Sequence, residues 1–190
     1  VYFQSIVRGL VHMRSLFDRL RARVEYLRAL RYELNALNRV DQVQVCTRAN
    51  GDYLASFAPS LAPRMLAGLR AGIDTTRYEF RPTGREPRTL LFVGSFRHEP
   101  NKVAIEWFIR EVLPRVVERV PDVKLVVAGS DPPPPHAYGG QAGALVLLGF
   151  VDDIRELMAR YAVFICPILS GSGVRVKLLE AFAAGIPVVS

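Results

Sequence analysis

The sequence predicts an α/β fold: a doubly wound, Rossmann-like parallel sheet, preceded by a long helix and a remnant of an N-terminal domain. Three observations indicate this. Short apolar runs without polar alternation recur after residue 88, and helix-like segments separate them. Strands of this kind are buried on both faces, as in a parallel sheet whose crossover helices cover both sides. Half of the 190 residues are hydrophobic, which is enough to form a sizeable core.

Composition excludes several protein classes. Charged residues make up 23% of the chain, so the composition is not that of a disordered protein. No apolar stretch approaches the ~20 residues of a membrane-spanning helix. The two cysteines, Cys46 and Cys166, are far apart, which excludes a disulfide scaffold and a cysteine zinc site. Such cysteine usage is typical of a reducing compartment, and we expect a cytoplasmic protein.

The chain begins with a segment that we set aside and continues with a basic helix. Residues 1–5 read VYFQS and resemble the end of a viral-protease site used to remove purification tags. Residues 6–40 form the predicted helix, in which eight arginines against three acidic residues leave +5 of the total charge of +7. Its apolar residues recur at three- and four-residue spacing. They are Leu10, Met13, Phe17, Leu20, Val24, Leu27 and Leu34.

This spacing gives one apolar stripe, which we expect to pack on the globular body. The alternative is a helix that faces a membrane surface or a partner, because its polar face is rich in arginine. The chain could then be peripheral to the inner face of the membrane. We expect no nucleic-acid partner, since the segment carries no nucleic-acid motif and basic charge alone is unspecific.

Residues 41–80 contain short elements of a partial domain. The sequence predicts a strand within 41–47, a helix over 48–57 and a further short strand within 61–74. Residues 75–88 carry Pro82, Gly84 and Pro87 among charged residues, which is typical of a linker. We therefore divide the chain into residues 6–80, a linker over 81–88 and a domain over 89–190.

The second domain shows the alternation of strands and helices on which the fold prediction rests. A loop with four consecutive prolines is expected within residues 130–143. Right-handed crossovers between the strands give a doubly wound sheet, which binds ligands at the carboxyl ends of its strands. The strands are expected at 89–93, 123–128, 145–148, 162–166 and 186–189, and the helices at 101–111, 114–120, 153–160 and 174–184.

Two of the loops after strands resemble anion sites. In the first, Gly94 and Ser95 precede a helix expected to begin near Asn101, whose free N–H groups favour an anion. Glycine is also common in such loops for turn geometry alone. The second loop precedes the helix at 174–184 and has the composition of a phosphate cradle. Its candidate residues are Gly171, Ser172, Gly173, Val174 and Arg175.

Lys177 and Glu180 follow the second loop and share a helical face, because they are three residues apart. They could form a surface ion pair. Alternatively, the lysine neutralises phosphate and the glutamate accepts hydrogen bonds from ribose hydroxyls. In a third loop, Asp152 is a candidate N-cap for the next helix. The alternative there is that backbone groups near Val151 and the carboxylate of Asp153 bind the edge of a nucleobase.

Residues 90–190 resemble the nucleotide-sugar-binding C-terminal domain of the retaining glycosyltransferases of family 4, or group 1, which have the GT-B fold. The signature is residues 171–190, GSGVRVKLLEAFAAGIPVVS. The segments 92–95 (FVGS), 100–101 (PN) and 149–153 (GFVDD) fall at the spacings of that family. A looser resemblance covers residues 41–80, where 71–74 (AGID) stand in place of the usual NGVD.

The resemblance implies a bacterial enzyme that transfers a sugar from a nucleoside diphosphate sugar to a saccharide or lipid-linked acceptor with retention, in polysaccharide or glycolipid synthesis. It implies that Lys177 and Glu180 are catalytic and that the other candidate residues bind the donor. It implies no metal and no cofactor. Two positions depart from the family: Ser172 replaces the first of two glutamates, and Ser95 replaces an arginine.

Length adds a further expectation. A GT-B enzyme has two Rossmann domains, and the first ~80 residues are too few for a complete one, since each βαβ unit needs about 30 residues. We therefore interpret the chain as part of a longer enzyme that is inactive alone and tends to self-associate. The alternatives are a non-catalytic nucleotide-binding module and a GT-B-fold epimerase or phosphorylase.

Overall fold

The computed structural model describes residues 15–68, 72–132, 143–169 and 174–190. The chain forms two compact units. The first comprises Val1–Gly72 with Ser170–Arg175, and the second comprises Ile73–Leu169 with Val176–Ser190. Within the described ranges, no helix is both long enough and apolar enough to cross a membrane.

The first unit contains a long helix and a small two-stranded sheet. Strands β1 and β2 pair in parallel, with Val43 opposite Met65. Val43, Val45 and Leu54 form the small buried core between them and the helices. The elements are α2 (Leu16–Leu37), β1 (Val43–Val45), α3 (Arg48–Phe57), the 3₁₀ turn η1 (Pro59–Arg64) and β2 (Met65–Ala67). The strand and helix expected at 41–47 and 48–57 are confirmed.

Within the first unit, the packing of α2 differs from the expected stripe. The helix ends at Leu37 rather than near Val40. It contacts the core of its unit through Leu34, which the predicted stripe contained, but also through residues outside that stripe, Tyr26, Leu30 and Leu37. The contacts of α2 with this core lie between Tyr26 and Leu37, in the C-terminal part of the helix. The stripe residues Phe17, Leu20, Val24 and Leu27 are exposed, and Leu10 and Met13 lie outside the described residues.

The second unit is the predicted Rossmann-like sheet. Its strand order is β5-β4-β3-β6-β7, and every neighbouring pair is parallel. The strands are β3 (Glu86–Val93), β4 (Lys124–Ala128), β5 (Leu145–Gly149), β6 (Tyr161–Ile165) and β7 (Val188–Val189). The helices are the 3₁₀ turn η2 (Thr75–Arg77), α4 (Glu99–Trp107), the π-helical turn η3 (Phe108–Val112), α5 (Leu113–Arg119), α6 (Ile154–Arg160) and α7 (Val176–Ala183).

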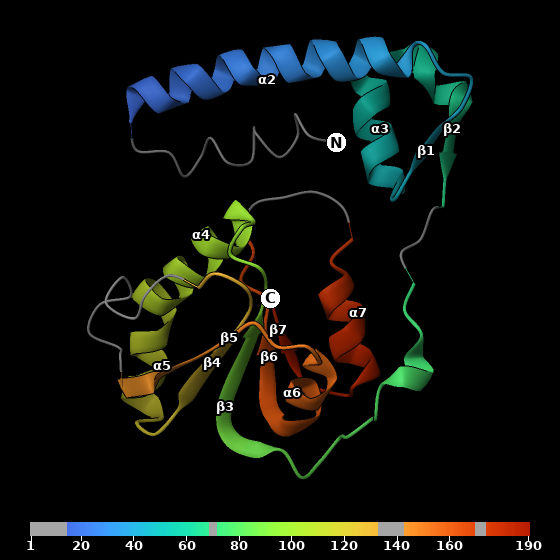
Figure 1. Ribbon diagram of the computed structural model, residues 1–190. Coiled ribbons are helices and arrows are strands. Elements are labelled where there is room, and N and C mark those ends of the chain that lie inside the picture. Colours follow the sequence, from blue (N-terminus) through green and yellow to red (C-terminus); the bar gives the residue numbers. More distant parts are fainter. Residues whose placement is uncertain (1–14, 69–71, 133–142, 170–173) are drawn as a thin grey trace. The chain divides into compact units, whose positions relative to one another are not determined.

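Helices cover both faces of this sheet (Figure 1). On one face, α4, η3 and α5 contribute Ile105, Ile109 and Leu113 to a core with Phe92 of β3. On the other face, α6 and α7 pack against Leu91. Leu91 and Phe92 are adjacent in the chain and are both 0% exposed. Burial on both faces explains why these strands lack polar alternation.

Residues 75–88 are not a linker. Residues 86–88 belong to β3, and the segment before them packs on the second unit. The Arg81 amide donates to the Ala184 carbonyl at 3.1 Å. The Phe80 ring lies where a side chain at Gly185 would be, since an added Cβ would be 2.8 Å from it. Proline and glycine in this segment therefore mark an extended chain bound to α7. The proline run at 133–135 lies outside the described residues.

Arg85 binds the C-terminal ends of two helices. Its guanidinium donates to the carbonyls of Met158, Tyr161 (3.1 Å) and Ala184 (2.6 Å), and its Nε donates to the Arg81 carbonyl at 2.9 Å. The last carbonyls of a helix have no partner inside the helix. Partial burial lowers the pKa of Arg85, and the nearby charge of Arg81 lowers it further. Arg85 therefore fixes α6 and α7 relative to the start of β3.

We predict that Arg85→Met lowers the free energy of unfolding by about 1.5–3 kcal/mol, the contribution typical of hydrogen bonds to a charged group. Urea denaturation of the full chain measures this change. The matched control is Arg81→Met, whose side chain is half-exposed and pairs with Glu79 at 2.8 Å. Exposed pairs of this kind contribute little, so this variant should unfold near the wild-type midpoint. Equal midpoints for the two variants would contradict the prediction.

Candidate functional site

The loop after β3 is built around a buried asparagine. Asn101 is 7% exposed, and its Nδ2 donates to the Ser95 carbonyl at 2.8 Å. A Cβ at Gly94 would be 2.9 Å from the Asn101 side chain, so only glycine leaves room for it. Three predicted residues, Gly94, Ser95 and Asn101, are thus brought together. Asn101 maintains the conformation of the loop, a role that its position in the sequence did not predict.

The N-terminus of α4 offers fewer free donors than expected. The helix begins at Glu99 rather than near Asn101. Pro100 has no N–H, and the Asn101 amide donates to the His98 carbonyl at 2.9 Å. The carboxylate of Glu99 also lies in this first turn. An anion at this edge of the sheet therefore needs positive charge from another element.

Lys177 supplies positive charge at this edge. Its Nζ donates to the carbonyl of Val93, the last residue of β3, at 2.8 Å and to Asn101 Oδ1 at 3.2 Å. The ammonium also lies 5.4 Å from the centroid of the Phe92 ring. These contacts place the first turn of α7 at the carboxyl end of β3, beside the loop of Gly94. Lys177 thus connects the loop after β3, which is the first candidate loop, to α7, which follows the second candidate loop.

The loop after β4 also belongs to this edge of the sheet, although no site residue was predicted in it. An added Cβ at Gly129, whose φ is +157°, would be 1.9 Å from the Gly94 carbonyl oxygen. The hydroxyls of Ser95 and Ser130 are 2.8 Å apart, and the Phe96 amide donates to the Ser130 carbonyl at 3.0 Å. Gly129 and Ser130 directly follow a predicted strand, and that position was the available signal. The loops that follow β3 and β4 are therefore interlocked, that is, packed against each other and joined by hydrogen bonds.

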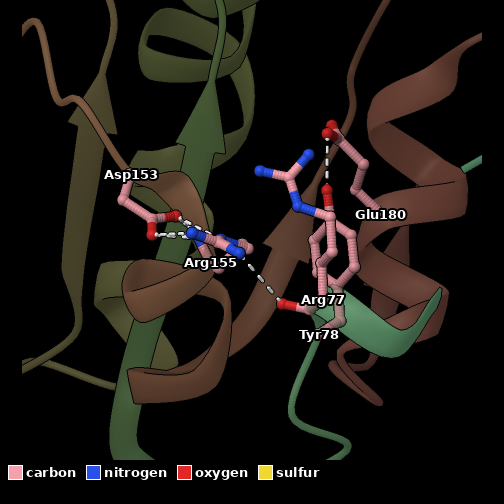
Figure 2. A network of polar contacts seen from close by, with 5 residues as sticks. All are labelled: Arg77, Tyr78, Asp153, Arg155 and Glu180. Atoms are coloured by element: carbon pink, nitrogen blue, oxygen red, sulfur yellow. Dashed lines mark hydrogen bonds and ion pairs between the residues drawn. The ribbon is translucent and has the colours of Figure 1, made fainter. Parts of the chain in front are cut away.

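Glu180 lies about one turn beyond Lys177 on α7 and has a different partner. Its Oε1 accepts a hydrogen bond from the Tyr78 hydroxyl at 2.8 Å (Figure 2). Burial, together with this bond, raises the pKa of Tyr78 to about 12. The phenol is therefore a hydrogen-bond donor throughout the physiological pH range. Tyr78 lies far from Glu180 in sequence, within residues 75–88, whose composition is typical of a linker, and no motif pointed to it.

Asp153, not Asp152, caps α6. Its Oδ1 accepts from the Arg155 amide at 2.9 Å, and both its oxygens accept from the Arg155 guanidinium at 2.5–3.0 Å. The Arg155 guanidinium holds the pKa of Asp153 at about 2. Arg155 also donates to the Arg77 carbonyl at 3.3 Å (Figure 2). The Asp153 carboxylate is thus charged and bound, and Val151, two residues earlier in the chain, is half-buried. Nucleobase recognition at these two residues stays a prediction.

None of the contacts described above involves the predicted residues of the second candidate loop, 171–175. Gly171, Ser172 and Gly173 lie outside the described residues. Val174 and Arg175 are exposed and belong to the first unit. Among the residues that the structure describes, no group of three or more histidine, cysteine, aspartate or glutamate side chains could hold a metal ion.

Comparison with known proteins identifies several relatives. The family model described as "Glycosyl transferases group 1" matches residues 87–190. A phosphatidyl-myo-inositol mannosyltransferase of Mycolicibacterium smegmatis is 32% identical over 127 residues, which are 63% of this chain and 32% of that protein. The enzyme of the same name from Mycobacterium leprae is 29% identical over 168 residues, 85% of this chain and 38% of that protein. The chain spans about a third of the length of these relatives.

Solved structures share the fold. The crystal structure of Anabaena Alr3699/HepE in complex with UDP and glucose superposes with a TM-score of 0.61 at 17% identity. The match covers 84% of this chain and 47% of that one. This likeness supports the C-terminal half of a GT-B fold for the parallel sheet of the second unit. The family match covers 104 of the 190 residues, from 87 to 190, and the chain therefore belongs to the group 1 glycosyltransferases.

Proposed function

We propose that the second unit binds the donor of a glycosyltransferase that transfers a sugar from a nucleoside diphosphate sugar to a saccharide or lipid-linked acceptor with retention of configuration. One observation carries the proposal. The Lys177 ammonium is fixed at the carboxyl end of β3, and the Glu180 carboxylate follows on the same helix. A cation thus lies at the edge where such sheets bind ligands, and a hydrogen-bond acceptor follows about one turn later on the same helix.

The spacing of the two side chains matches the order of groups in the donor. Three residues of helix rise about 4.5 Å, and side chains at this spacing lie on one face. In a nucleoside diphosphate, the diphosphate is attached directly to the ribose. Lys177 is the group that would bind the diphosphate, and the Glu180 carboxylate would accept hydrogen bonds from the two ribose hydroxyls.

The proposed chemistry is electrostatic. As the bond between the sugar and the diphosphate breaks, positive charge develops on the sugar and negative charge on the leaving phosphate. A fixed ammonium at the carboxyl end of β3 stabilises that negative charge more strongly in the transition state than in the bound donor. Ser95 and Ser130 could contribute hydroxyl donors from the interlocked loops. The proposal requires no metal and no cofactor.

The curated relatives support a lipid-linked acceptor. The mycobacterial proteins are named as phosphatidyl-myo-inositol mannosyltransferases. We therefore place the reaction in glycolipid synthesis at the inner face of the membrane. The groups that position the acceptor are proposed to lie in the remainder of a longer enzyme, so that the chain alone binds the donor but does not transfer the sugar.

We predict that Glu180→Gln weakens nucleoside diphosphate binding by about tenfold to a hundredfold, because a charge-assisted hydrogen bond contributes roughly 1.5–3 kcal/mol. Isothermal titration calorimetry with UDP, GDP and ADP measures this effect. The matched control is Glu118→Gln on α5, an exposed residue on the helix layer of the opposite sheet face. Unchanged affinity in a folded Glu180→Gln variant would show that Glu180 has no part in binding.

We also predict that Lys177→Met weakens diphosphate binding by about tenfold or more, since a charged partner of the phosphates is lost. The variant should lose the preference for a nucleoside diphosphate over the corresponding monophosphate, which calorimetry with UDP and UMP compares. Lys124→Met is the matched control. Lys124 is the first residue of β4 and therefore lies at the amino end of the strand, away from the candidate site at the carboxyl ends. A preference for the diphosphate that survives in Lys177→Met would exclude this role.

A further inference from the structure

Tyr78 lies outside residues 87–190, the segment that the family model matches, yet it contacts the candidate donor site. Its hydroxyl donates to Glu180 Oε1 at 2.8 Å (Figure 2). The tyrosine precedes the sheet in sequence, whereas the glutamate lies on its last helix. The bond therefore connects the segment before β3 to the face of α7 that carries the site.

Hydrogen bonds hold the backbone both before and after Tyr78. Before it, Asp74 caps η2 by accepting hydrogen bonds from the amide and the hydroxyl of Thr76, at 3.1 and 2.6 Å. The Arg77 carbonyl accepts a bond from Arg155 at 3.3 Å. After it, the Arg81 amide donates to the Ala184 carbonyl at 3.1 Å. The hydroxyl is thus presented to Glu180 by a segment held to α6 and α7.

The Tyr78 ring is also packed. It lies against the core of the α6 and α7 face, together with partly buried Ile154 and Leu178. A phenylalanine would keep this packing and lose only the hydroxyl. The contribution of the hydrogen bond can therefore be separated from that of the ring.

The bond leaves Glu180 able to bind a ligand. A carboxylate has two oxygens and about four acceptor positions. Tyr78 occupies one of these on Oε1, so Oε2 and a further position remain for two hydroxyl donors. Holding one oxygen also restricts the rotation of the glutamate side chain, and less conformational freedom is then lost when a ligand binds.

We propose that Tyr78 is a positioning residue of the donor site, which orients the Glu180 carboxylate toward the vicinal hydroxyls of the donor ribose. The inference rests on the proposed function of Glu180. It extends the donor site to the segment before β3. It also assigns this segment a role in affinity for the ribose that is separate from its role in holding α7.

The test compares ligands with and without ribose hydroxyls. Tyr78→Phe should weaken the binding of UDP, GDP or ADP, whichever the wild-type chain binds, by about three- to tenfold, the factor expected for one lost hydrogen bond. Affinity for the 2′,3′-dideoxy form of the same nucleotide should not change. Calorimetry on the full chain gives both affinities. Their ratio within one variant does not depend on the fraction of folded protein.

Two further variants sharpen the test. In Tyr78→Phe combined with Glu180→Gln, binding should be no weaker than in Glu180→Gln alone, because the tyrosine acts through the glutamate. The matched control is Tyr32→Phe on α2, where the side chain is 76% exposed. It should bind the ribose and dideoxy forms with wild-type affinities.

The possible failures are distinguishable. If Tyr78→Phe weakens both forms equally, or if the effects of the two substitutions add, Tyr78 has only a structural role and the function proposed for Glu180 stands. If the wild-type chain binds no nucleoside diphosphate, or binds the ribose and dideoxy forms equally, the function proposed for Glu180 fails and the inference about Tyr78 fails with it.

Discussion

The bond from the Lys177 ammonium to the Val93 carbonyl is the contact on which the candidate site depends. It joins the first turn of α7 to the carboxyl end of the central strand β3 at 2.8 Å. The same ammonium contacts Asn101, which holds the loop after β3. One positive charge thereby links a strand end, a loop and a helix. This bond sets the position of the first turn of α7 at the edge of the sheet where ligands bind.

The segment from Ile73 to Arg85 holds the rest of α7. Tyr78 contacts the middle of the helix through Glu180, and Arg85 binds the carbonyl at its C-terminal end. The short helix is thus held at its beginning, middle and end by residues distant in sequence. The same segment contacts α6 through Arg85 and through the carbonyl of Arg77. It therefore belongs structurally to the sheet domain, although its composition is that of a linker.

Prediction succeeded where the physical signal was local or periodic. The strand at 123–128 was predicted because an apolar run buried on both faces needs no polar residues. The end of the helix at 48–57 was predicted because Pro59 follows it, and α3 does end at Phe57. Prediction failed where a partner lies far away in the chain. Asp152 and Asp153 are both acceptable N-caps by residue type, and only the backbone conformation selected Asp153. Within its own unit, α2 packs through Tyr26, Leu30 and Leu37 and, from the predicted stripe, only through Leu34, because the sequence of a helix does not specify which elements will pack against it.

The sequence by itself determined the parallel sheet, its two helix layers and the edge at which a ligand would bind, because these follow from apolar runs and the handedness of crossovers. It also placed Lys177 and Glu180 on one helical face, since that depends only on their spacing. Only the tertiary structure decided what those side chains contact. The partners Val93, Asn101 and Tyr78 are 76 to 102 residues away. No local rule of spacing or propensity reaches that far, so these contacts exist only once the chain has folded.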